Sequence, residues 1–194
     1  MNIKDGIMKR ILKNKKALST VVTTLIILVV SVLLATVVTF YAINVTSTRV
    51  QEENLQIYKQ HIWHNGSNFA EAAFLIVNSG GRDIVVDKIS VRGQECLWTT
   101  IYYNKTSGII YNDLTYIPPN SNGTLLGKSV TIGSATYNLT RANTDLILKS
   151  GDKMIVYATN PDSVSVKDVG VPVGVTVFTA NAQYYKECNV GASI

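Results

Sequence analysis

A run without any charged side chain extends from Ala17 to Thr48, and this run constrains the fold more than any other feature of the sequence. Within it, the segment from Val21 to Ile43 is almost continuously apolar. As a helix rising about 1.5 Å per residue, this segment is long enough to cross the hydrocarbon core of a bilayer. Its many Val, Ile and Thr residues favour a strand in water. In lipid, an isolated segment must satisfy its own backbone hydrogen bonds, so the sequence predicts a helix.

The basic residues gather ahead of the apolar run. Residues 1–17 hold six of the 18 basic side chains and one of the 13 acidic side chains, so the rest of the chain carries 12 of each. Positive charge on the N-terminal side predicts that this end stays in the cytoplasm and that the remainder lies outside. Residues 18–194 therefore carry no net charge and lack the positive electrostatic potential that attracts nucleic-acid phosphates, which argues against nucleic-acid binding.

Three interpretations compete for the basic and apolar segments. An ordinary secretory signal peptide has a shorter apolar stretch and a small-x-small cleavage site, and residues 40–44 offer no such site. A permanent signal anchor fits both the length and the charge. The third interpretation places a cleavage before the apolar run, inside the sequence KNKKALSTVVTTLIILVVSVLL.

That stretch resembles the class III signal peptide of archaeal type IV pilins and archaellins, most closely that of an adhesive pilin. The resemblance implies that Lys16 and Ala17 are the last leader residues and that prepilin peptidase leaves Leu18 as the new N-terminus. Bacterial type IV pilins carry Glu at the fifth mature position, where this chain has Val22, so the resemblance is to the archaeal branch. It also implies a membrane-inserted precursor, self-assembly into an extracellular helical filament, and the help of an assembly ATPase and a membrane platform protein.

Small and hydroxyl side chains recur at helical spacing within the run. Ser31, Ala35 and Thr39 fall four residues apart, as do Thr20 and Thr24, so each set lies on one helical face. Such small-xxx-small spacing lets helices approach closely in an apolar environment, which suits a filament core. Chance spacing is the alternative, because membrane helices tolerate Ser and Thr.

The helix is predicted to continue to residue 64. Residues 44–64 contain no Pro or Gly, and Asn65-Gly66 supplies a stop signal. His61 and His64 lie three residues apart near this end, but the sequence indicates no further ligands, and we expect no metal site. The predicted organisation is therefore a leader at 1–17, a hydrophobic helix at 18–64 and an outer domain at 65–194.

The outer domain has the short alternating segments and frequent turns of a β protein. The sequence FLIVNSGGRDIVVDKISVRG indicates two strands joined through residues 78–81 as a hairpin. Turn residues separate the further predicted strands, at 97–103, 109–116, 129–132, 146–149, 154–158 and 173–180. Together they predict an α+β chain whose long N-terminal helix precedes an antiparallel, Ig-like β-sandwich. The stretches NSGGRDIVVDKISVRG and LKSGDKMIVYA also resemble strand-turn-strand segments of archaeal pilin heads.

Five Asn-x-Ser/Thr sequons are candidates for glycosylation if the body lies outside the cell. Asn44 is a poor candidate, because it lies at the end of the apolar run. The better candidates are Asn65, Asn104, Asn122 and Asn138. Chance occurrence in a chain rich in Asn and Thr is the alternative.

Two cysteines, Cys96 and Cys188, lie far apart and outside any CxxC pair. In an extracellular domain, a disulfide between them is the favoured interpretation. Two buried thiols are the alternative.

The sequence offers no catalytic constellation, so we expect no enzyme, cofactor or metal. Both histidines lie in the predicted helix, and neither GxxxxGK[ST] nor GxGxxG occurs. The favoured function is a structural subunit of an extracellular pilus-like filament that serves adhesion or cell contact. The alternatives are an archaellin, a minor pilin, or a membrane-anchored monomeric binding module.

Overall fold

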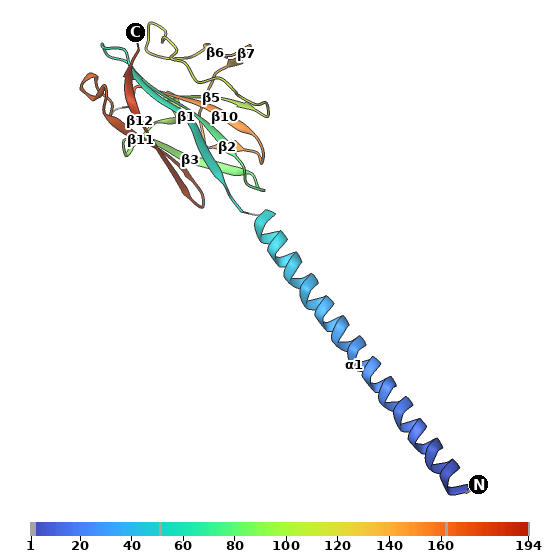
Figure 1. Cartoon of the computed structure of the whole chain (residues 1–194). Helices are drawn as coiled ribbons and strands as arrows, with labels where there is room; N and C mark the ends of the chain where they lie inside the picture. The colour runs from blue at the N-terminus through green and yellow to red at the C-terminus, as the bar shows by residue number, and fades with distance from the viewer. Residues whose placement is uncertain (1–2, 51, 162, 194) are drawn as a thin grey trace. The chain divides into compact units, whose positions relative to one another are not determined.

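The structure is a computed structural model that describes residues 3–50, 52–161 and 163–193, with the side chains of residues 18–48, 52–161 and 163–193. The chain divides into two compact units, residues 1–49 and 50–194. The first unit is a long α-helix, and the second is a mostly antiparallel, curled β-sheet (Figure 1). The predicted α+β class is confirmed at this level.

Helix α1 runs from Ile3 to Val50, and its residues 18–48 contain neither Gly nor Pro. The prediction that it continues to residue 64 is wrong, because strand β1 occupies Leu55–His64. Leu55 and Ile57 are buried while Gln56 and Tyr58 are exposed. This period of two is the pattern of a strand with one face on a core.

The second unit contains the strands and two short 3-10 helices. After β1 come β2 (Ala70–Asn78), β3 (Ile84–Val91), β4 (Gln94–Glu95), η1 (Trp98–Thr100), β5 (Ile101–Thr106), β6 (Ser129–Ile132), β7 (Ala135–Asn138), β8 (Thr140–Arg141), β9 (Leu146–Leu148), β10 (Lys153–Thr159), η2 (Val166–Asp168), β11 (Pro172–Thr179) and β12 (Gln183–Ala192).

One sheet holds most of these strands in the order β4-β3-β11-β12-β1-β2-β10-β5-β8, with β9 paired to β3. All its pairs are antiparallel except β1 with β12, which are parallel over three residue pairs. Strands β2 and β3 do not pair with one another, so the predicted hairpin is wrong. Strand β2 instead lies between β1 and β10, where nearly every residue is buried.

Two core clusters lie on opposite faces of β2. Alternate residues from Ala70 to Ile76 belong to the first cluster, which they share with side chains of β3 and β11. Ala73 and Leu75 belong to the second cluster, which is covered by residues between Ile110 and Leu139. The segment 109–116, predicted as a strand, contributes buried Ile110 and Leu114 to this cover without forming a strand. All residues of both clusters lie at or beyond Leu55, so the sheet unit encloses its core without using the described side chains of the helix.

Candidate functional site

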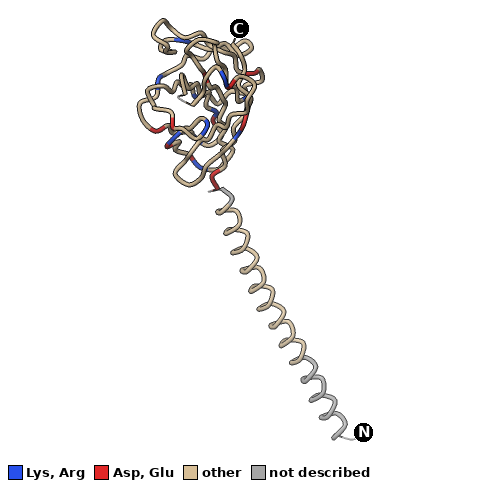
Figure 2. Tube along the Cα trace, turned by 90° about the vertical axis from the view of Figure 1, so that its left-hand side faces the viewer, with Lys and Arg blue, Asp and Glu red and all other residues tan. Residues whose placement is uncertain are grey.

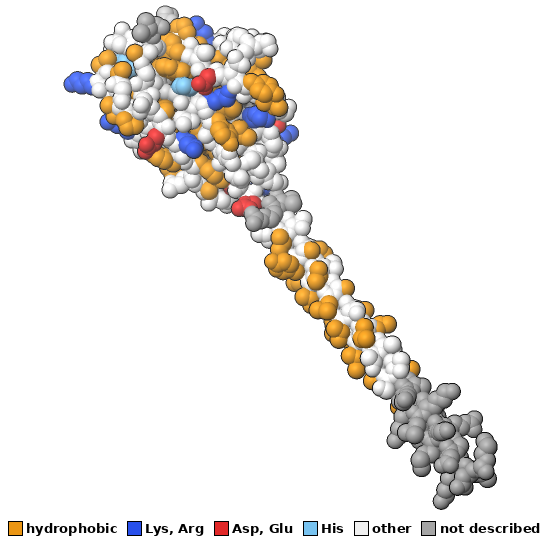
Figure 3. All heavy atoms as spheres, in the orientation of Figure 1, with side chains coloured by type: hydrophobic (Ala, Val, Ile, Leu, Met, Phe, Trp, Pro, Cys, Tyr) orange, Lys and Arg blue, Asp and Glu red, His pale blue; other side chains and the backbone are white. Residues whose placement is uncertain are grey.

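Between residues 18 and 48, where its side chains are described, α1 has a mostly apolar surface without charged groups. Figures 2 and 3 show that the described part of the helix carries no Lys, Arg, Asp or Glu and is covered with hydrophobic side chains. Its large apolar side chains are between 43% (Val45) and 70% (Tyr41) exposed. The segment Leu18–Thr48 spans 31 residues, its most apolar 18-residue window has a mean hydropathy of 2.9, and by length and composition it could cross a membrane. Such a surface requires an apolar environment or other helices to cover it.

Six hydroxyl groups of the helix are bonded to its own backbone. Thr24, Ser31 and Thr39 donate to carbonyl oxygens three or four residues earlier, at 2.9, 2.7 and 2.8 Å. The same bond is made by Thr23, Thr36 and Thr48. These donors are therefore satisfied inside the helix and can face lipid or another helix without an unpaired polar group.

The residues predicted to form a packing face lie on one helix, as the sequence indicated. Ser31, Ala35 and Thr39 are exposed residues of α1, as are Thr20 and Thr24. At the predicted leader cleavage, the side chains of Lys16 and Ala17 lie outside the described residues, and Leu18 is 68% exposed. Packing and cleavage both stay predictions.

The four candidate sequons differ in how their amides are held. Asn122 is exposed in a turn closed by a bond from the Gly123 amide to the Asn120 carbonyl, at 2.8 Å. Asn65 is half-buried, and its Oδ1 accepts bonds from two backbone amides of the following loop. Nδ2 of Asn104 donates to the carbonyl of Asn138 at 2.7 Å. The Asn122 side chain is therefore more accessible than those of Asn65 and Asn104, and Asn138 is likewise an exposed residue.

The two cysteines are thiols in this structure and do not form the predicted disulfide. The Cys96 amide donates to the Ile89 carbonyl, which places Cys96 beside β3, whereas Cys188 lies in β12. Strand β11 lies between β3 and β12, and strands are spaced about 4.8 Å apart. A disulfide requires Cα atoms within roughly 7 Å of one another. Cys188 pairs with Val173 of β11, whereas Ile89, beside which Cys96 lies, pairs with Val177, four residues further along β11. Burial raises the pKa of the Cys188 thiol to about 11.

The two histidines lie on β1 and have separate partners. Nε2 of His61 lies 2.9 Å from Oδ2 of Asp113, and its ring stacks on Trp63 with centroids 5.1 Å apart. Nδ1 of buried His64 accepts a bond from the Gly66 amide. Among the residues that the structure describes, no group of three or more His, Cys, Asp or Glu is arranged to hold a metal ion.

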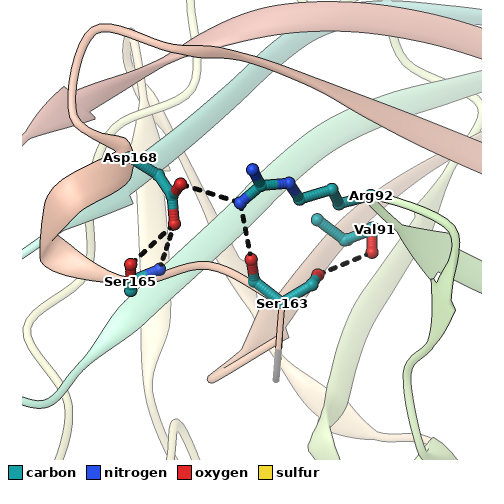
Figure 4. Close-up of polar contacts among 5 residues, drawn as sticks. All are labelled: Val91, Arg92, Ser163, Ser165 and Asp168. Carbon is teal, nitrogen blue, oxygen red and sulfur yellow. Dashed lines mark hydrogen bonds and ion pairs between the residues drawn. The ribbon is translucent and has the colours of Figure 1, made fainter.

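A polar cluster joins the β3–β4 turn to the loop before β11 (Figure 4). Nη1 of Arg92 donates to Oδ1 of Asp168 at 2.7 Å and to the Ser163 carbonyl at 3.1 Å. The amide and hydroxyl of Ser165 donate to the other carboxylate oxygen. The two bonds from Ser165, together with Arg92, hold the pKa of Asp168 at about 2. No local pattern in the sequence indicates this contact, because its members are about 70 residues apart.

Glu71 is a buried acidic residue that the sequence analysis does not identify. Glu71 of β2 is 0% exposed, one carboxyl oxygen accepts a bond from the Ile117 amide at 3.0 Å, and the other has no partner among the described groups. Burial raises the pKa of Glu71 to about 8, against the lowering effect of that bond. Tyr157, whose hydroxyl donates to the Thr115 carbonyl, has a raised pKa because it is buried and because Glu71 is near. Glu71 thus lies on the face of β2 that carries Ala73 and Leu75, beside the second core cluster.

Compared with known families and with curated proteins, the chain matches neither a protein-family model nor a curated sequence.

Proposed function

We propose that this chain is a structural subunit of an extracellular, archaeal type IV pilus-like filament. Residues 1–17 are the leader that prepilin peptidase removes, and the following helix spans the membrane before assembly and forms the filament core afterwards. The curled sheet is an Ig-like sandwich that coats this core. Adhesion or cell contact is the role that such a filament would serve, and the head has no enzymatic part in it.

The exposed, charge-free helix is the observation that carries the proposal. Its 31 residues extend for about 46 Å, whereas the hydrocarbon core of a bilayer is about 30 Å thick. The helix thus has more uncharged surface than one membrane crossing requires. Contact with helices of neighbouring subunits would cover this surface along its whole length.

The short side chains support helix packing as the means of assembly. A bilayer is as apolar as Leu, so a helix that leaves lipid gains little from the hydrophobic effect, and close contact must supply the specificity. Ser31, Ala35 and Thr39 form a face on which a neighbouring backbone can approach. The hydroxyls of Ser31 and Thr39 already have partners in their own helix, so no donor is buried unpaired in that contact.

Shearing followed by sedimentation tests the proposal. Cells that express the chain are sheared, cell bodies are removed, and the supernatant is centrifuged at high speed, with a known monomeric lipoprotein followed as the control. We expect the subunit in the high-speed pellet and filaments in negatively stained images. Recovery only as a detergent-extracted monomer would contradict the filament and favour a membrane-anchored binding module. A rotating filament would instead indicate an archaellin.

A further inference from the structure

A polar groove lies on the face of β3, β4, β11 and β12 that points away from the first core cluster. Its volume is about 340 Å³. The residues that define it here are Lys88, Ser90, Glu95, Thr176, Gln183 and Tyr185. None of them belongs to the proposed filament helix.

The strand register arranges the groove in two rows. Thr176 of β11 pairs with Ser90 on one side and Tyr185 on the other, and Ser90 pairs with Glu95, which gives a row across four strands. Two residues along β11, Phe178 pairs with Lys88 and with Gln183, which gives a second row. Residues two apart on a strand share a face, so both rows line the same surface.

The ring of Tyr185 lies flat across the neighbouring strand. A Cβ atom at Gly174 would lie 2.3 Å from its Cε2 and 2.6 Å from its hydroxyl oxygen, so this position of the ring depends on glycine. The hydroxyl donates to the carboxylate of Glu187, which fixes the ring in its plane. The side chain is nevertheless 57% exposed, so one face of the ring is open to solvent.

The other groups of the groove can donate and accept hydrogen bonds. The side chains of Gln183 and Glu95 form no hydrogen bond with other residues that the structure describes, so their amide and carboxylate are available to a ligand. The ammonium of Lys88 is held 4.5 Å from the centre of the Phe178 ring. Ser90, only 3% exposed, supplies a hydroxyl at the floor. One Lys and one Glu balance, so the lining carries no net charge.

This combination fits a carbohydrate. A pyranose ring has a C–H face that stacks on an aromatic ring, and a rim of hydroxyls that both donate and accept hydrogen bonds. A phosphate or carboxylate ligand would require an excess of basic groups. We propose that the polar groove binds a neutral oligosaccharide, with a sugar ring on Tyr185 and its hydroxyls on Gln183, Glu95 and Lys88. The groove needs no filament, so this proposal stands apart from the assembly role.

Binding of defined sugars to the full chain tests the proposal. The protein is kept in a polyoxyethylene detergent, because maltoside detergents would themselves present sugars. Maltotetraose, cellotetraose and chitotetraose are titrated to about 10 mM, with saturation-transfer NMR and calorimetry as readouts. We expect saturable binding of at least one of them, and Tyr185→Ala should weaken it by about tenfold or more. Tyr111→Ala is the matched control, because Tyr111 is 81% exposed outside the groove and should leave binding unchanged.

Two further variants separate ring position from folding. Gly174→Ala keeps the tyrosine but forces its ring away, and Gln183→Ala removes one exposed amide. Both should weaken binding, and circular dichroism should show a folded sheet for Gln183→Ala even if Gly174→Ala unfolds. The proposal is overturned if none of the three sugars saturates, or if Tyr185→Ala binds like the unaltered chain. Neither result would affect whether filaments form.

Discussion

The carboxyl group of Glu71 accepts a hydrogen bond at 3.0 Å from the backbone amide of Ile117, a residue of the second core cluster. Glu71 lies on central strand β2, and Ile117 lies in the irregular segment that covers this face of the sheet. A single acid therefore joins the sheet to its cover, and it does so without exposure to solvent.

Stability should fall as the pH rises through the range in which Glu71 titrates. Its pKa is about 8 in the folded chain against 4.5 as the ordinary value, so the folded state holds the proton more tightly. The stabilisation is complete below about pH 4.5 and is lost progressively towards pH 8, by on the order of 4 kcal/mol. Urea unfolding of the full chain in detergent, followed by Trp fluorescence at pH 5, 7 and 9, measures it.

Glu71→Gln is the matched control for this prediction. Glutamine keeps the shape and the acceptor for Ile117 but cannot ionise, so the loss of stability between pH 5 and 9 should shrink by most of its size. An unchanged pH dependence would show that Glu71 is already ionised in the folded chain at neutral pH.

The Arg92–Asp168 contact should hold the loop that contains η2. Arg92→Ala removes the donor to Asp168 and to the Ser163 carbonyl. Amide hydrogens of residues 163–169 should then exchange faster, as measured by hydrogen–deuterium exchange and mass spectrometry. Arg141→Ala, at an exposed position of β8, serves as the control and should leave this loop unchanged. Equal exchange in all three proteins would contradict a clamping role.

The same contact should persist through the neutral pH range and weaken only in strong acid. The pKa of Asp168 lies at about 2, below its ordinary value of 3.8, so the carboxylate contributes stability above pH 3.8 and loses it as the pH falls through 2. Exchange in residues 163–169 should therefore be insensitive to pH between 5 and 8 once the intrinsic rate is corrected. A corrected exchange rate that changes between pH 5 and 8 would contradict an Asp168 pKa of about 2.

Bulk on the predicted packing face should block assembly but not membrane insertion. Ala35→Leu adds apolar volume at the centre of the face formed with Ser31 and Thr39, so close approach of helices is lost. Val37→Leu is the matched control, because Val37 lies about 200° around the helix from Ala35. We expect sheared filaments from the control and only membrane-bound protein from Ala35→Leu. Normal filaments from both would show that this face is not a contact.

If sequons are used, Asn122 should carry a glycan. Its amide is exposed in a turn, whereas Asn104 donates to the Asn138 carbonyl. Intact mass of the secreted chain should exceed the sequence mass, and Asn122→Gln should remove a discrete part of that excess. Asn104→Gln is the comparison and should remove less. A mass equal to that of the polypeptide would contradict modification altogether.

Structural elements that depend on short-range sequence patterns are predicted correctly, whereas elements and pairings that depend on contacts between distant segments are not. The apolar run, the strands near 129–132, 154–158 and 173–180, and the α+β class all follow from short-range patterns and are confirmed. The sequence does not distinguish strand β1 from a helix because Leu55, Tyr58 and Ile62 also fit a helical face. Strands β2 and β12, on either side of β1, decide in favour of a strand. Pairing partners are set by sheet order, which also explains the missing hairpin.

The candidate sites divide in the same way. The packing face and the sequons are visible as spacing and motif, so they could be named in advance. The predicted disulfide between the two cysteines rests only on an extracellular location. The strand order shows that β11 separates β3, beside which Cys96 lies, from β12, which contains Cys188. Three further features join residues that are far apart in the chain: the Glu71 hydrogen bond, the Arg92–Asp168 contact and the polar groove. No local sequence pattern predicts them.

N-terminal sequencing with intact mass, on protein sheared from the cell surface and sedimented, tests the filament account most directly. We expect a single N-terminus at Leu18, with Lys16 and Ala17 removed. An N-terminus at Met1, in protein released only by detergent, would contradict both the leader cleavage and the filament.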